Sequence, residues 1–250
     1  MCKSLLIKIA FTALFSLVGW TSLAQKKALQ ITQEWADTAV QVDGDVSEWD
    51  LKHYHAAAGL HFNLRNDESH IYFALKSANA EVMNKIMMGG ISFSANLESD
   101  KKNPPKILFP ILDRTPGKPG AQTKINSREE QQQYLLSRIR DVRVFGFREI
   151  PDGAISLQNN YGIKAAAGFD AEGNYTQEIA IPIKLLNIEN PSDPLTYQVR
   201  LNGITQRNNN ARPSVSSGMY GRPVYTPSLP KALAATEFYI KSQLATKNQL

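Results

Sequence analysis

The chain has 250 residues, with 28 Lys and Arg against 23 Asp and Glu, a formal net charge of +5 and one cysteine, Cys2. The basic residues are scattered and form no dense stripe, which argues against a nucleic-acid-binding protein. A single cysteine cannot form a disulfide within the chain, so a buried core has to stabilise the fold.

The first 24 residues have the pattern of a secretory signal peptide. Positive charge at Lys3 and Lys8 accompanies an apolar run over residues 5–20, and small residues follow it. We therefore expect cleavage between Ala24 and Gln25. The apolar run is shorter than the roughly 20 residues of a membrane-spanning helix, so no transmembrane segment is expected after cleavage. The predicted localisation is periplasmic, outer-membrane-associated or secreted.

After a leader over residues 25–38, the patterns are those of short β-strands. A first strand is expected at residues 39–42, directly before an Asp-Gly turn. Strict alternation over 60–66 and 70–76, around an Asn-Asp-Glu-Ser turn, predicts a hairpin. Alternation of this kind favours an antiparallel sheet with one buried and one wet face.

Two short helices and one irregular region are expected next. Residues 79–88 and 127–139 carry apolar side chains at helical spacing, each behind a capping residue. Residues 98–124 are rich in Lys, Pro and Gly, and only residues 107–112 in their middle look buried, which is typical of an excursion from the sheet with mobile ends. We therefore expect residues 98–142 to form an insertion that leaves the sheet.

Strand patterns fill most of the remaining chain. A Pro-Asp-Gly sequence at 151–153 is expected to be a hairpin turn, and a short helical turn is expected at 182–186. The expected strands are residues 143–150, 154–157, 162–169, 175–181, 195–206 and 235–241. Short strands separated by Gly, Pro and Asn turns predict an all-β fold with minor α content, an antiparallel β-sandwich of the immunoglobulin or jelly-roll kind. The sandwich is expected to be a single domain over residues 39–250.

Planar donors and aromatic side chains gather in the polar loop over residues 207–230. Such residues are typical of sugar or peptide recognition, because rings stack on sugars while Asn and Arg bind hydroxyl groups. The alternative is an ordinary long surface loop. Together with two aromatic residues of the N-terminal half, the candidate ligand-binding residues are Trp49, Tyr54, Arg207, Asn209, Arg212, Tyr220, Arg222 and Tyr225.

Two cofactor hypotheses arise beside the default of no cofactor. Asp43 and Asp45 belong to an acidic cluster, and oxygen-rich clusters suit calcium, although turn chemistry is the alternative. Methionines at 83, 87 and 88 raise axial haem ligation, against the alternative of core filling. No nucleophile elbow or phosphate-binding glycine loop occurs in the sequence, so a non-enzymatic protein is expected.

Three motifs in order resemble family 9 carbohydrate-binding modules and the related DOMON-like domains. VDGDVSEW at residues 42–49 resembles their "DG…W" opening. NDESHIYFALK at 66–76 is similar to their second signature, and EIAIPIKLL at 178–186 to a segment near their end. The resemblance covers residues 39–241, and the chain is also similar to small exported proteins of Bacteroidetes-type bacteria that carry this domain.

The resemblance implies an antiparallel β-sandwich and, in part of the family, sugar binding. Sugar-binding members clamp a terminal sugar between two tryptophans; here Trp35 precedes the expected fold and Trp49 belongs to the opening motif, so the clamp is not transferred. The expected function is an exported, non-enzymatic binding module with a glycan ligand. The alternatives are an envelope protein that docks a protein partner without a small ligand, and a haem-binding DOMON-like domain.

Overall fold

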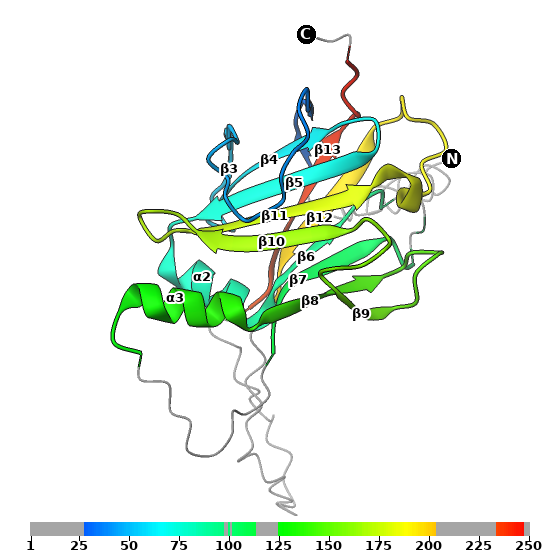
Figure 1. Cartoon of the computed structure of the whole chain (residues 1–250). Coiled ribbons are helices and arrows are strands. Elements are labelled where there is room, and N and C mark those ends of the chain that lie inside the picture. Colours follow the sequence, from blue (N-terminus) through cyan, green and yellow to red (C-terminus); the bar gives the residue numbers. More distant parts are fainter. Residues whose placement is uncertain (1–27, 98–99, 101, 114–124, 204–233, 248–250) are drawn as a thin grey trace, which may run out of the picture.

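The described residues of this computed structural model form two β-sheets packed face to face, with two short helices at the side (Figure 1). The structure describes residues 28–97, 100, 102–113, 125–203 and 234–247. The larger sheet has the order β1 (Leu29–Gln30), β13 (Thr236–Ser242), β12 (Leu195–Leu201), β6 (Ile91–Ser94), β7 (Lys106–Leu112), β8 (Ile139–Phe145) and β9 (Gly153–Ser156). The smaller sheet has the order β10 (Lys164–Phe169), β11 (Tyr175–Pro182), β5 (His70–Ser77), β4 (Leu60–Asn66) and β2 (Glu34–Trp35), with β3 (His53–His55) also paired to β4.

The strand pairings define an antiparallel sandwich. Neighbouring strands of the described chain are antiparallel except for two short pairs, where β1 runs parallel to β13 and β2 runs parallel to β4. The predicted hairpin forms β4 and β5, with Leu64 opposite Phe73. The expected all-β sandwich with minor helical content is therefore confirmed.

Four fully buried aromatic rings tie the two sheets together. Phe62 and Phe73 belong to the smaller sheet, while Phe93 and Tyr197 belong to the larger one. Phe73 stacks on Phe93 with 4.5 Å between ring centroids, and Phe93 stacks on Tyr197 at 5.8 Å. Aromatic pairs contribute about 0.5–1.5 kcal/mol beyond their burial, so this column fixes how the sheets face each other.

Both expected helices form and carry the predicted caps. Helix α2 (Ala80–Gly89) begins after Asn79, whose side-chain oxygen accepts the backbone N–H of Glu81 at 2.9 Å. Helix α3 (Arg128–Ser137) begins after Ser127, whose hydroxyl accepts the N–H of Glu130 at 3.1 Å. The short helical turn is η1 (Ile183–Leu186). Within the described ranges, no helix is long and apolar enough to cross a membrane.

The N-terminal region differs from the expected leader and first strand. The described part of the leader contributes β1 and β2, so Trp35 belongs to the fold and does not precede it. Residues 39–42 form no strand; Val40 and Val42 pack on the outer face of the smaller sheet, beside Trp49. The alternating pattern arose because one side of an extended segment lies flat on that face.

The outer face of the hairpin is therefore not fully wet, as its alternation predicted. Val46 and Trp49 pack there with Tyr72 and Ala74 of β5 and Ala180 of β11. All eight residues of β11 are buried. The segment over residues 36–51 thus covers the middle of this sheet.

The expected insertion at 98–142 is wrong for its middle part. Lys106–Leu112 forms β7 within the larger sheet, between β6 and β8, and β8 begins at Ile139. Ile107 and Phe109 are fully buried and help to fill the core. The Pro and Gly residues that suggested an excursion flank β7 on both sides, which hid a core strand between them.

The hairpin turn expected at 151–153 is also wrong. Strand β8 ends at Phe145, β9 begins at Gly153, and residues 146–152 connect them. The Asp152 carboxylate accepts the N–H of Gly146 at 2.8 Å and closes this longer connection. Asp152 therefore acts as a turn residue, but the connection that it closes has seven residues, whereas a three-residue turn was expected.

Candidate functional site

The first and third sequence motifs are joined through one buried carboxylate. Glu178 on β11 is 1% exposed and accepts three hydrogen bonds from the covering segment. The indole N–H of Trp49 donates to Glu178 Oε1 at 2.8 Å, while the N–H groups of Gly44 and Asp43 donate to Oε2 at 2.9 and 3.1 Å. This side chain therefore fixes the loop over residues 43–51, which we call the DG loop.

A glycine is required where the DG loop meets β10. Gly44 has a φ of +92°, and a Cβ there would lie 2.7 Å from the carbonyl carbon of Ala167. The Thr176 hydroxyl donates to the carbonyl of Gly44 at 2.6 Å from β11. Close approach and hydrogen bonding together hold the DG loop rigidly against the sheet.

Burial raises the pKa of Glu178 to about 7, against the hydrogen bonds from Gly44, Trp49 and Asp43, which lower it. The nearby negative charge of Glu48 adds to the rise. A carboxylate removed from water loses solvation that three donors replace only in part. The anchor of the DG loop therefore titrates near neutral pH.

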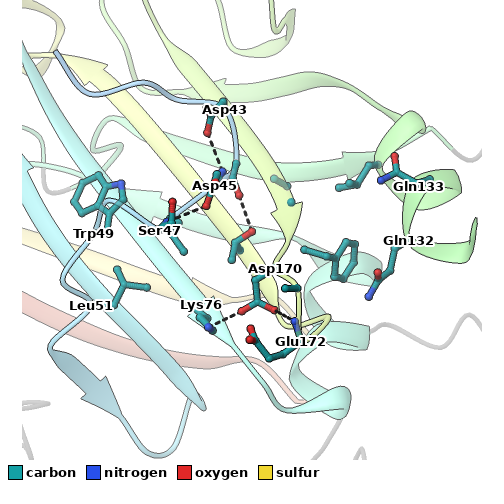
Figure 2. A pocket seen from close by; sticks show the side chains of 18 of the residues that line it. Asp43, Asp45, Ser47, Trp49, Leu51, Lys76, Gln132, Gln133, Asp170 and Glu172 are labelled. Carbon is teal, nitrogen blue, oxygen red and sulfur yellow. Dashed lines mark hydrogen bonds and ion pairs between the residues drawn. The ribbon is translucent and has the colours of Figure 1, made fainter. Parts of the chain in front are cut away.

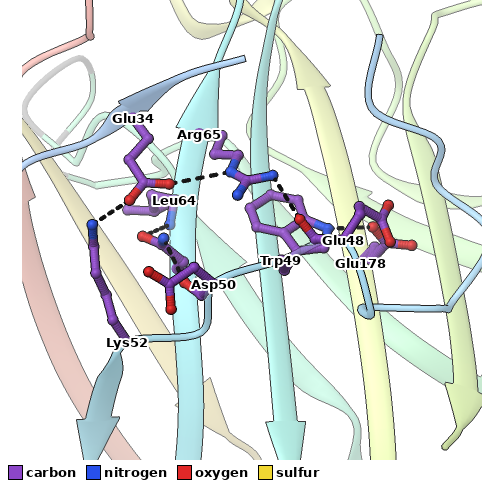
Figure 3. A network of polar contacts seen from close by, with 9 residues as sticks. Glu34, Glu48, Trp49, Asp50, Lys52, Leu64, Arg65 and Glu178 are labelled. Carbon is purple, nitrogen blue, oxygen red and sulfur yellow. Dashed lines mark hydrogen bonds and ion pairs between the residues drawn. The ribbon is translucent and has the colours of Figure 1, made fainter. Parts of the chain in front are cut away.

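A polar network encloses Trp49 on its outer side, as Figure 3 shows. The guanidinium of Arg65 lies 4.6 Å from the centroid of the indole ring, within range of a cation–π contact. Arg65 also donates to Glu34 at 3.2 Å, and Lys52 pairs with the same carboxylate. Trp49 is only 7% exposed, so this predicted ligand residue lies as a buried anchor beneath the network.

Asp43 and Asp45, the predicted calcium ligands, use one carboxylate oxygen each within the DG loop. Asp43 Oδ1 accepts the N–H of Asp45, and Asp45 Oδ1 accepts the N–H of Ser47, both at 2.9 Å. Among the residues that the structure describes, no group of three His, Cys, Asp or Glu side chains could hold a metal ion. Calcium binding at these residues stays a prediction.

A cleft of about 850 Å³ opens at the edge of the smaller sheet, between the DG loop, the ends of β5 and β10, and α3. Figure 2 shows Gln132 and Gln133 on α3 facing Asp43, Asp45 and Ser47 across the opening. The volume lies within the range of about 300–1,000 Å³ that is typical of small-molecule sites. Its polar lining residues include Asp43, Asp45, Ser47, Lys76, Glu129, Gln132, Gln133, Asp170 and Glu172.

An ion pair and a tight turn fix the floor of this cleft. Lys76 Nζ lies 2.5 Å from Asp170 Oδ2, and the N–H of Asn174 donates to Asp170 Oδ1 at 2.7 Å. Burial raises the pKa of Asp170, but the hydrogen bonds from Lys76 and Asn174 outweigh it and hold the pKa well below its usual range. Asp170 is therefore ionised at every pH at which the protein is expected to work.

Helix α3 is tied to the same turn. Arg128 Nη2 donates to the carbonyl of Gly173 at 2.8 Å, and Gln132 Nε2 reaches the same oxygen at 3.4 Å. The α3 wall of the cleft is thus held in place by the β10–β11 turn, while the DG loop wall is held by Glu178 and Thr176 of β11. Gln133 is exposed and lines the opening one position further along the helix.

Tyr54 lies in a different place, at a second pocket of about 530 Å³. Its side chain is 55% exposed, and its ring lies 4.6 Å from that of His61. Residues of β3, β4, α2, β12 and β13 meet there. This Tyr54 pocket is lined by Tyr54, Ala56, Ala57, Ala58, Gly59, His61, Ala78, Asn79, Glu81, Val82, Lys85, Leu201 and Thr236.

The structure thus separates the predicted ligand residues. Trp49 lies at the cleft with the two predicted calcium ligands, while Tyr54 lies at the other pocket. The signal-cleavage residues Ala24 and Gln25 lie outside the described residues. The same holds for the remaining candidates, Arg207, Asn209, Arg212, Tyr220, Arg222 and Tyr225.

Sequence reasoning missed the residues that shape both pockets. Glu178 belongs to the motif at residues 178–186, and its place in a continuous apolar stretch, Ile179-Ala180-Ile181, could have marked it as a buried carboxylate. Gln133 and Lys85 carry no comparable signal, because their neighbours in space come from distant segments. Met87, one of the proposed haem ligands, packs in the hydrophobic core, and Met83 packs against it.

No protein-family model matches the chain, and no curated protein matches it. Among solved structures, the chain is similar to a family 9 carbohydrate binding module from Caldicellulosiruptor kristjanssonii in complex with glucose. The sequence identity is 11%, with 88% of this chain and 98% of that chain covered and a TM-score of 0.35. For a structure of such a module from the same organism in complex with cellotriose, the identity is 10%, the coverage is 90% and 97%, and the TM-score is 0.33. Both structures belong to the family that the sequence motifs resemble, and their low TM-scores leave the function to be argued from the residues of this chain.

Proposed function

We propose that this chain is an exported, non-enzymatic carbohydrate-binding module that holds its glycan in the cleft between the DG loop and α3. The observation that carries the proposal is the cleft itself, an opening of about 850 Å³ on rigid walls, whose polar lining side chains are mostly amides and carboxylates beside apolar ones. Rigid walls reduce the entropy that is lost when a ligand binds, which favours affinity for flexible hydroxyl-rich molecules.

The lining of the cleft matches what a sugar requires. Gln133 offers both donors and an acceptor, and the exposed Glu172 and Asp45 offer acceptors for hydroxyl groups. Phe169 is partly exposed in the cleft and adds an apolar surface for the C–H face of a sugar ring. The two structures to which the chain is similar hold glucose and cellotriose, so these sugars are the first probes.

Calorimetric titration with glucose and cellotriose tests the proposal. We expect measurable binding to the purified protein and at least a threefold loss of affinity in Gln133→Ala, because an amide hydrogen bond contributes about 0.5–1.5 kcal/mol. Gln131→Ala is the matched control, since Gln131 is exposed on the same helix but does not line the cleft. Titrations without heat across neutral and acidic glycans, with the fold intact by circular dichroism, would contradict the proposed function.

Export is the second part of the proposal, and it is supported by the charge and apolar pattern of residues 1–24. N-terminal sequencing of the protein recovered from a bacterial envelope fraction should begin at Gln25. A chain that keeps Met1 and stays in the cytoplasm would contradict export but would leave glycan binding by the cleft intact.

A further inference from the structure

The Tyr54 pocket contains a buried ammonium group without a carboxylate partner among the described residues. Lys85 on α2 is 5% exposed and lines the pocket, and its Nζ donates to the Thr236 hydroxyl at 2.9 Å. An ammonium group can donate three hydrogen bonds, so the Thr236 hydroxyl satisfies only one of its three donors. Burial lowers the pKa of Lys85, which reflects the same loss of solvation.

Among the described residues that line the pocket, no acidic side chain forms an ion pair with Lys85. Glu81 is the one carboxylate among the lining residues; it is exposed in the first turn of α2, and no ion pair joins it to Lys85 in the described part of the chain. Leu201 and Thr236, the paired ends of β12 and β13, border the pocket on its other side. An unpaired buried charge is costly, so a site of this kind is stabilised by an anion from outside.

The composition of the chain between β12 and β13 points the same way. Residues 204–233 contain no Asp or Glu but carry Arg207, Arg212, Arg222 and Lys231. This segment therefore cannot supply a carboxylate to Lys85 from any of its positions.

An aromatic surface stands at the rim of the same pocket. Tyr54 is 55% exposed, and its contact with the His61 ring supports it from one side. An exposed ring of this kind offers a face on which the C–H side of a sugar can stack. The pocket volume of about 530 Å³ fits one sugar unit with part of its neighbour.

We propose that the Tyr54 pocket is a second binding site, for an acidic sugar unit whose carboxylate pairs with Lys85 while its ring stacks on Tyr54. The ligand class is a uronic acid within a glycan chain. Charge and hydrogen bonding to Lys85 supply the selectivity over neutral sugars, because an ammonium–carboxylate hydrogen bond is about twice as strong as a neutral one. This inference rests on the proposed glycan-binding function for the sugar ring, but it places a different ligand at a different site.

Calorimetric titration with trigalacturonate, cellotriose and succinate tests the inference on the purified protein at 150 mM salt. We expect trigalacturonate to bind, and Lys85→Met to weaken it at least about tenfold while leaving cellotriose binding unchanged. Tyr54→Ala should weaken trigalacturonate several-fold. Lys164→Met is the matched control, because Lys164 is exposed on β10 and lines neither pocket, and it should change nothing.

The outcomes separate the two proposals. If cellotriose binds but trigalacturonate does not, or if Lys85→Met keeps the wild-type affinity for trigalacturonate, the acidic-sugar site is wrong and the cleft stands. Succinate binding as tightly as trigalacturonate, with loss in Lys85→Met, would show a carboxylate site without sugar recognition and would overturn the sugar part. If no glycan binds, both proposals are wrong.

The two variants are chosen to keep the fold intact. Lys85→Met removes a buried charge and keeps the apolar stem, so this variant should fold. Tyr54→Ala gives an independent check at an exposed position.

Discussion

The cleft and the Tyr54 pocket differ in whether a sequence motif marks them. The DG loop, which forms one wall of the cleft, carries a recognisable sequence motif. Two of its residues, Trp49 and Gly44, stabilise the fold by donating hydrogen bonds to the buried Glu178. The Tyr54 pocket has no motif, yet it holds an exposed ring and a buried, undersupplied charge, Lys85. The motif residues Gly44, Trp49 and Glu178 thus hold the fold together, whereas Gln133, Tyr54 and Lys85, which line the two pockets, lie outside the motifs.

The two regions also differ in electrostatics. The cleft has an acidic side, with Asp43, Asp45, Glu129 and Glu172 on its walls, and it suits neutral hydroxyl-rich ligands. The Tyr54 pocket is lined by the buried Lys85, with Glu81 as the one carboxylate among its lining residues. A single glycan with neutral and acidic units would therefore find complementary sites at two places on one sandwich.

Removing Trp49 should have the largest effect on stability. Trp49→Ala deletes a large buried side chain and leaves Glu178 without one of its three donors, so we expect a loss of about 3–5 kcal/mol in the free energy of unfolding. Urea unfolding followed by circular dichroism measures it. Trp49→Phe keeps most of the ring and should lose clearly less. A loss below about 1 kcal/mol in Trp49→Ala would show that the DG loop is not anchored through this residue.

Glu178 should make stability depend on pH in an unusual direction. Its pKa in the fold is about 7, above the ordinary value, so its stabilising contribution is complete below pH 4.5 and is lost as pH rises through 7. We expect unfolding experiments to show a decline of about 1–3 kcal/mol between pH 4.5 and 7.5 that is missing in Glu178→Gln.

The comparison with Glu178→Gln is needed because two histidines change the free energy of unfolding in the opposite direction between pH 4.5 and 7.5. Burial lowers the pKa of His53 and His55, so their contributions are present above pH 6.5 and are lost as pH falls. These residues are unchanged in the variant, and the difference between the two pH curves isolates Glu178. Parallel curves for the two proteins would contradict a raised pKa at this anchor.

Sequence patterns predicted those helices and strands in which the spacing of apolar residues alone indicates the buried side. The hairpin over β4 and β5, both helices and the β10–β11 hairpin follow from local alternation, spacing and caps. The same patterns gave wrong predictions where contacts with distant segments decided which residues are buried. Val40 and Val42 alternate like a strand because they lie on a sheet face, and β7 was missed because Pro and Gly surround it.

The sites could be predicted only in part, for the same reason. Tyr54 is a candidate from the sequence because an aromatic residue among polar ones is visible there, but Lys85, which lines the same pocket, looks like an ordinary helix residue. Only the pairing of β12 with β13 brings Thr236 to Lys85, 151 positions away along the chain. Sequence spacing carries no trace of that contact, nor of the one between Gln132 and Gly173.

The ion pair in the floor of the cleft should contribute a smaller amount. Asp170→Asn removes the charge that pairs with Lys76, and we expect a loss of about 1 kcal/mol, since the lysine is partly exposed. The low pKa of Asp170 means that its contribution is present above pH 4 and is lost as pH falls further. Thermal unfolding at pH 7 and pH 2 measures both effects, because the contribution is lost mainly as pH falls toward the low pKa of the folded state. A variant equally destabilised at both values would point to the Asn174 hydrogen bonds in place of the charge.

Tyr54→Ala should have the smallest effect on stability of all, within about 0.5 kcal/mol of the wild type, because more than half of the side chain faces solvent. Trp49 and Tyr54 were grouped by sequence as ligand residues, so the pair measures directly how far the structure separates them. A large loss on removing Trp49 with an unchanged Tyr54→Ala would assign one aromatic residue to the fold and leave the other for a ligand. Comparable losses in both would mean that Tyr54 also holds the sandwich together, and its exposed ring would then be no evidence for a binding surface.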